Sequence, residues 1–100
     1  MRVIALKTLR DFYARHPAAA PALKAWTQEA RQASWKTPQD IKNRYGSASF
    51  LKGNRVVFNI KGNEYRLVVA VAYRFEAAYI KFIGTHAQYD VIDAQTIEME

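Results

Sequence analysis

The end of the last apolar run carries polar side chains that could move protons or bind an anion. The stretch IGTHAQYDVI, residues 83–92, places Thr85, His86, Tyr89 and Asp90 within six positions. If a helix starts at Thr85, His86 is three residues from Tyr89 and four from Asp90, so the three share one helical face. An imidazole, a phenol and a carboxylate side by side suit acid–base catalysis. The backbone N–H groups at the helix start favour an anion.

A structural role is the alternative for the same stretch. Thr85 and Gln88, three residues apart, match a capping box, in which each side chain accepts a hydrogen bond from the other residue's backbone. Capping explains Thr85 and Gln88 but does not require His86, Tyr89 or Asp90. Both interpretations remain open until the partners of this stretch are known.

A second polar cluster is expected at the end of a hairpin. The β-rich runs RVVFNI and EYRLVVAVAY are separated by Gly62-Asn63, which tolerates positive φ and suits a two-residue turn. Counting outward from this turn pairs Lys61 with Glu64 and Asn59 with Arg66. Side chains alternate between the faces of a sheet, so these four project to one side. The apolar residues expected on the other side, under the helices, are Val56, Phe58, Ile60, Tyr65, Leu67 and Val69.

The donors of this cluster suit a phosphate group. Arg66 offers a bidentate fork, Lys61 a point charge and Asn59 an orienting amide. A solvated sheet face with a cross-strand ion pair is the plain alternative. Arg66 argues against that alternative, because it interrupts an otherwise apolar strand where a cation is desolvated unless it faces a groove or an anion. The third run, AYIKFIG, adds Lys81, whose face the sequence leaves open.

Helices precede these strands. MRVIAL predicts a short first strand, and Leu9, Phe12, Tyr13 and His16 then fall on one helical face before Pro17. In the next helix Leu23, Trp26, Ala30 and Ala33 form a stripe that we expect to cover the sheet. TPQD, residues 37–40, predicts the start of a short third helix. The expected architecture is one small α+β domain spanning residues 1–100, with N-terminal helices packed on an antiparallel sheet.

Composition and charge narrow the range of possible functions. The 100 residues contain no cysteine and only two histidines, which excludes a disulfide framework, a cysteine nucleophile and a thiolate zinc site. Residues 1–60 carry eleven Lys and Arg against three acids, a balance of +8, whereas residues 61–100 carry four against six, a balance of −2. The net charge of +6 suits a polyanion or an acidic protein. Without a signal peptide or a membrane-length apolar segment, the expected location is the cytoplasm.

The chain also resembles a known family. VVFNIKGNEYRLVVAVAY followed by YIKFIGTHAQYDVI is similar to the HigB branch of the RelE-like toxins, the messenger-RNA interferases of type II toxin–antitoxin modules. The resemblance implies a ribosome-dependent endoribonuclease without metal or other cofactor, which cleaves A-site mRNA by attack of a ribose 2′-OH on the adjacent phosphate. It also implies a helix-turn-helix, HigA-like antitoxin, which could assemble with the toxin as a heterotetramer.

On this resemblance the polar residues acquire roles. His86 would be the acid or base, Arg66 and Lys61 would neutralise the phosphate, and Tyr89 would stack on a base or share in proton transfer. The RNA-binding residues would be Asn59, Lys81 and Asp90, although Asp90 could equally orient His86. The alternative function is a non-catalytic basic module that binds RNA, the ribosome or a protein. Two surfaces are candidates for the antitoxin, the Leu23–Trp26–Ala30 stripe and the basic face of residues 10–15.

Overall fold

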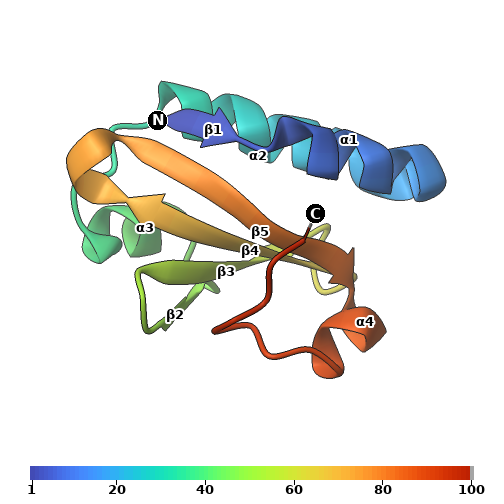
Figure 1. Ribbon diagram of the computed structural model, residues 1–100. Helices are drawn as coiled ribbons and strands as arrows, with labels where there is room; N and C mark the ends of the chain where they lie inside the picture. Colours follow the sequence, from blue (N-terminus) through green and yellow to red (C-terminus); the bar gives the residue numbers. More distant parts are fainter. Residues whose placement is uncertain (100) are drawn as a thin grey trace.

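The computed structural model describes residues 1–99 as helices on a five-stranded sheet (Figure 1). In chain order the elements are β1 (Arg2–Ile4), α1 (Leu6–Arg15), the 3-10 turn η1 (Pro17–Ala19), α2 (Ala20–Gln32), α3 (Pro38–Arg44), β2 (Ser49–Leu51), β3 (Arg55–Ile60), β4 (Tyr65–Ala72), the 3-10 turn η2 (Tyr73–Phe75), β5 (Ala77–Thr85) and α4 (His86–Asp90). The three expected β-rich runs are β3, β4 and β5. The α+β class is confirmed.

The sheet is mixed, which corrects the expectation of a purely antiparallel one. Its strand order is β1-β5-β4-β3-β2, and the pairs β2–β3, β3–β4 and β4–β5 are antiparallel. β1 instead pairs parallel with the start of β5, with Arg2 opposite Ala77 and Ile4 opposite Tyr79. Backbone hydrogen bonds form in either orientation, so a three-residue strand contains no local signal for the direction of its partner.

The β3–β4 hairpin has the expected register but a different turn. Asn59 lies opposite Arg66, and the last strand pair is Ile60 with Tyr65. The connection is therefore the four residues 61–64, not the two-residue Gly62-Asn63 turn. Positive φ values occur at Lys61 (54°) and Gly62 (65°), one position earlier than predicted. For a residue with a side chain this left-handed conformation costs about 1–2 kcal/mol, so Lys61 occupies a strained position.

One face of the sheet packs against α1 and α2 and forms the main core. The residues expected there from β3 and β4 are buried: Val56, Phe58, Ile60, Tyr65, Leu67 and Val69. The stripe of α2 contributes Leu23, Trp26 and Ala30, each at most 3 % exposed. The stripe is thus core, as expected, and offers no surface to a partner.

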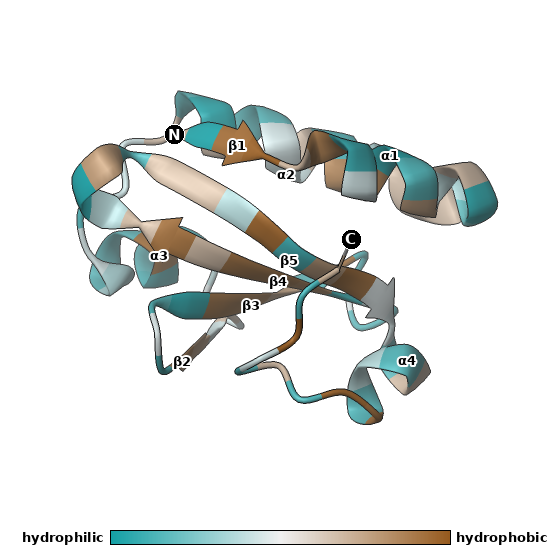
Figure 2. Cartoon of the chain, viewed as in Figure 1, coloured by the Kyte–Doolittle hydropathy of each residue, from teal (hydrophilic) through white to brown (hydrophobic). Residues whose placement is uncertain are grey.

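The other face of the sheet is covered by α4 and the segment that follows it (Figure 1). Val57, Val68 and Phe82 form a second, smaller apolar cluster there. Partly buried residues of the C-terminal region, among them Tyr89 and Ile97, pack against this cluster. Figure 2 shows the hydrophobic colouring concentrated along the central strands that supply both clusters. The sequence did not predict this second layer.

Local signals placed the short helices correctly. Thr37 caps α3 in a reciprocal arrangement with Asp40, and Pro38 occupies the first helical position. Such a cap contributes about 1 kcal/mol to stability.

None of the helices within residues 1–99 combines the length and apolar character needed to span a bilayer.

Candidate active site

The helix that carries the candidate acid–base residues is joined to the sheet by hydrogen bonds at its first turn. Gln88 N donates to Thr85 Oγ1 at 3.1 Å, and Thr85 N donates to Gln88 Oε1 at 2.8 Å, which confirms the capping box. His86 N in addition donates to the carbonyl of Glu64 at 3.0 Å. The start of α4 is therefore tied to the β3–β4 loop, so the two polar clusters predicted from sequence adjoin.

Gly84 makes room for this junction. A Cβ atom at Gly84 would lie 2.5 Å from Phe82 Cζ and 2.9 Å from Gln88 Oε1, far inside van der Waals contact. Gly84 also lies directly opposite Arg66 in the β4–β5 ladder. Because the residue opposite Arg66 has no side chain, α4 can approach this part of the sheet.

Arg66 is a half-buried cation without an acidic partner. Its guanidinium donates to Asn63 Oδ1 at 2.7 Å and to the carbonyls of Asn63 and Tyr65 at 3.1 and 3.3 Å. No carboxylate within residues 1–99 lies within ion-pairing distance of it. Neutral acceptors thus hold Arg66 in position while its positive charge stays uncompensated, which is the state that a phosphate-binding arginine requires.

Tyr89 lies between this cation and the second apolar cluster. Its ring centroid is 6.0 Å from the guanidinium carbon of Arg66, within the range of a weak cation–π contact, and 6.4 Å from the ring of Phe82. The ring is partly buried. Packing against Phe82 therefore fixes the ring beside the arginine and leaves part of it open.

His86 and Asp90 form a pair on the exposed side of α4. His86 Nδ1 lies 3.2 Å from Asp90 Oδ2, and the two side chains are 49 % and 57 % exposed. A carboxylate on Nδ1 orients an imidazole and leaves Nε2 to face a ligand. The predicted proximity of His86 and Asp90 is confirmed.

The two remaining hairpin residues lie at the rim of this region. Asn59 is half-buried and directly opposite Arg66 in the ladder. Lys61 is exposed, with Nζ 3.5 Å from Glu64 Oε2. An exposed pair at this distance is weak, so an incoming phosphate could replace the carboxylate of Glu64.

Lys81 lies apart from the other candidates. Val68 pairs with Phe82 and Val69 with Ile80, so Lys81 is the extra residue of a β-bulge. Its ammonium donates to Glu98 at 3.0 Å. This hydrogen bond, and the nearby charges of Lys81 and Arg55, lower the pKa of the Glu98 carboxyl below its usual value. The structure thus gives Lys81 an anionic partner from its own chain.

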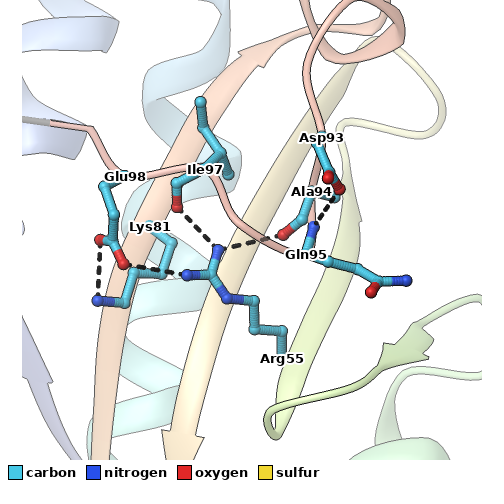
Figure 3. A network of polar contacts seen from close by, with 7 residues as sticks. All are labelled: Arg55, Lys81, Asp93, Ala94, Gln95, Ile97 and Glu98. Atoms are coloured by element: carbon cyan, nitrogen blue, oxygen red, sulfur yellow. Dashed lines mark hydrogen bonds and ion pairs between the residues drawn. The ribbon is translucent and has the colours of Figure 1, made fainter.

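The sequence did not predict the role of Arg55, whose guanidinium contacts Ala94, Ile97 and Glu98 of the C-terminal segment (Figure 3). It is a buried cation, 9 % exposed, whose Nη1 donates to the carbonyls of Ala94 and Ile97 at 3.1 and 2.8 Å. Its Nη2 lies 3.0 Å from Glu98 Oε1. Arg55 and Lys81 together bind the C-terminal segment to the sheet. We name Arg55, Lys81 and their shared partner Glu98 the C-terminal clamp. A cation at the first position of an otherwise apolar strand was the available signal.

The His, Asp and Glu side chains of residues 1–99 are not gathered into a candidate metal site. No group of three His, Cys, Asp or Glu side chains within residues 1–99 is arranged to hold a metal ion. Of the two histidines, His16 stacks on Phe12 with ring centroids 4.4 Å apart, whereas His86 begins α4 and its backbone N–H is bound to the carbonyl of Glu64 in the β3–β4 loop. The cluster of Arg66, Tyr89, His86 and Asp90 instead offers positive charge, an aromatic face and a proton carrier.

Helices on a mixed sheet, with a cluster of cationic, imidazole, phenol and carboxylate side chains where the last strand enters a short helix, define a small α+β domain with a candidate anion-binding site. The chain belongs to the HigB toxin family, described as the RelE-like toxic component of a toxin–antitoxin system, whose family model matches residues 19–92. It is therefore the toxic component of such a system.

Three curated relatives agree with this family. The mRNA interferase toxin HigB of Escherichia coli (strain K12) is 30 % identical over 96 residues, which cover 94 % of this chain and 92 % of the relative. The mRNA interferases HigB of Escherichia coli O157:H7 and Shigella flexneri match with the same identity and coverage. The similarity thus spans both halves of the fold, from the helices to α4.

Proposed function

We propose that this toxin is an mRNA interferase, an endoribonuclease that enters the ribosomal A site and cuts the bound message without a metal ion. Family membership and the names of the three relatives support the endoribonuclease class. The net charge of +6 supports an RNA-rich target, because basic proteins are steered to polyanions.

In the proposed reaction the ribose 2′-OH attacks the adjacent phosphorus and the 5′ oxygen of the next nucleotide leaves. The phosphorane that forms carries extra negative charge, which Arg66 and Lys61 would neutralise. His86 would transfer a proton at the attacking or the leaving oxygen, with Asp90 orienting its ring. Tyr89 would stack on a base or donate a hydrogen bond, and Asn59 would orient the phosphate.

The proposal depends above all on Arg66, a half-buried cation without an acidic partner among residues 1–99. A half-buried arginine normally needs an anion to offset its desolvation. Here its contacts within the described chain are neutral oxygens and the ring of Tyr89, and His86 is joined to the same loop through Glu64. A bound phosphodiester would supply the missing charge next to a proton carrier.

Membership of the family implies an antitoxin as partner, because the toxic component of such a system is paired with one. We propose that this antitoxin is a helix-turn-helix, HigA-like protein and that two copies of each chain assemble as a heterotetramer. We also propose that the toxin acts in the cytoplasm, where translating ribosomes are found.

Purified toxin incubated with mRNA-programmed ribosomes tests the activity. We expect cuts within the A-site codon. The fragments should carry a 2′,3′-cyclic or 3′ phosphate and a 5′ hydroxyl. Chelators at concentrations that preserve the ribosome should leave the cleavage rate unchanged. A 5′ phosphate would identify water as the nucleophile and refute the 2′-OH mechanism. Binding without any cut would favour the alternative, a non-catalytic basic module.

A further inference from the structure

A groove runs between α1 and α2 on the helical side of the molecule. Each helix contributes residues at spacings of three, four and seven, which is the face that one helix turns toward a neighbour. The cavity is about 370 Å³. Its lining consists of Leu6, Leu9, Arg10 and Tyr13 of α1 and Lys24, Thr27, Gln28 and Arg31 of α2.

The charge of this groove is one-sided. Arg10, Lys24 and Arg31 are exposed at its walls, and no Asp or Glu belongs to the lining. Lys24 lies over the ring of Tyr13, with Nζ 5.4 Å from the centroid. None of the three cations forms an ion pair with a carboxylate of residues 1–99. An occupant with negative charge would therefore meet three cations that have no ion-pair partner within the described residues.

The groove is also partly apolar, which favours a protein segment over an RNA backbone. Leu6 and Tyr13 are partly exposed beside the buried Leu9. A sugar–phosphate chain would engage the cations but leave these side chains without apolar contacts. An amphipathic helix with apolar residues on one face and acids at its edges matches both features.

The groove and the candidate active site lie on different sides of the sheet. α1 and α2 cover the face that carries the main core, whereas α4 packs with the second cluster on the opposite face (Figure 1). Residues that bind a partner in the groove are thus separate from those proposed to cut RNA. Substitutions in the groove can change one function without touching the other.

We propose that the α1–α2 groove is the docking site for an acidic, amphipathic segment of the cognate antitoxin. This inference rests on the proposed function only in taking the partner to be an antitoxin that neutralises the toxin. It adds a surface, with Arg10, Lys24 and Arg31 as charge contacts and Leu6 and Tyr13 as apolar contacts.

The test compares two double charge reversals. Arg10→Glu with Arg31→Glu alters the groove, and Lys36→Glu with Lys52→Glu changes the net charge equally at exposed positions outside it. Affinity for the antitoxin is measured with purified proteins, and toxicity is measured in cells with and without antitoxin. The groove variant should lose about 100-fold in affinity, at roughly tenfold per reversed charge. It should stay as toxic as the matched control yet escape neutralisation.

Other results would overturn the proposal. Antitoxin affinity equal to that of the matched control would exclude the groove as the docking site. Lost toxicity with full antitoxin binding would assign the groove to RNA or the ribosome instead.

If circular dichroism shows the groove variant unfolded, Gln28→Trp decides, because it fills the groove from an exposed position without changing charge. That variant should bind the antitoxin about tenfold more weakly, and parental affinity would refute the docking site. A parental protein that proves non-toxic would refute the proposed function, whereas the affinity measurement still tests the groove.

Discussion

Replacing Arg55 with methionine should destabilise the domain by about 2–4 kcal/mol. Methionine keeps most of the apolar stem but removes the hydrogen bonds from Nη1 to the carbonyls of Ala94 and Ile97. A hydrogen bond from a charged donor is worth about 1.5–3 kcal/mol. We expect less than the sum of the two, because carbonyls of a detached C-terminal segment can bind water. A total stability of about 5–15 kcal/mol is usual for a domain, so the loss is a large fraction.

Urea unfolding followed by circular dichroism measures this effect. The matched control is Arg44→Met, which removes an exposed ion pair with Glu29 at 2.7 Å and should cost at most about 1 kcal/mol. The clamp also supports the site, since Tyr89 and Ile97 pack on the same cluster, so cleavage should slow as well. A loss within about 0.5 kcal/mol of the control would show that the C-terminal segment is bound by its apolar contacts alone.

The clamp has a pH dependence whose sign follows from Glu98. Its pKa is lowered in the folded protein by Lys81 and Arg55. A lowered carboxyl pKa contributes stability that is present above the unfolded value of about 4.5 and is lost as the pH falls through the folded value. The parental protein should therefore exceed Glu98→Gln in stability at neutral pH, and the difference should vanish in acid. A constant difference across this range would show that the carboxylate charge is irrelevant.

Three further predictions concern the candidate site. Arg66→Ala should abolish toxicity but keep the fold, because the guanidinium contacts only the loop, the neighbouring carbonyl and Tyr89; an unfolded or fully toxic variant would contradict this. His86→Ala should slow single-turnover cleavage by about 10²–10⁴-fold with ribosome binding kept, whereas Thr85→Ala should cost about 1 kcal/mol of stability and leave the rate nearly unchanged; a parental rate in His86→Ala would make the imidazole structural. Lys61→Gly should raise stability by up to about 1 kcal/mol, because glycine adopts the positive φ of this position without the steric cost. The cleavage rate of this variant should fall, and an unchanged rate would remove Lys61 from the site.

The antitoxin test and the active-site tests address different surfaces. Arg66 and His86 belong to β4 and α4, whereas Arg10 and Arg31 line the helical groove. A toxin inactivated at His86 should therefore still bind its antitoxin with parental affinity. Such a variant also allows the complex to be prepared without toxicity to the producing cell.

The candidate site was predictable where its geometry is local. The proximity of His86 and Asp90 follows from four-residue helical spacing, and the Thr85 cap follows from a pattern of four residues. The pairing of Asn59 with Arg66 follows from strand alternation and a short connection. Even there the turn was misplaced by one residue, because several loop conformations satisfy the same register.

The contacts that complete the site join residues distant in sequence. The hydrogen bond from His86 N to the Glu64 carbonyl unites the two polar clusters, and both partners are backbone atoms that every residue type possesses. The Arg66–Tyr89 contact likewise depends on how α4 lies on the sheet. The sequence supplied the chemically competent groups, but their assembly required the tertiary fold.

By itself the sequence determined the α+β class, the helix caps, the hairpin register and the residues able to do chemistry. Periodicity, capping and strand alternation act over a few residues, so they are legible in the chain. Only the tertiary structure decided that β1 runs parallel to β5, that Arg55 is buried under the C-terminal segment and that Lys81 turns to Glu98. These depend on non-local burial and on backbone pairing that is indifferent to side-chain type, and no local pattern encodes them.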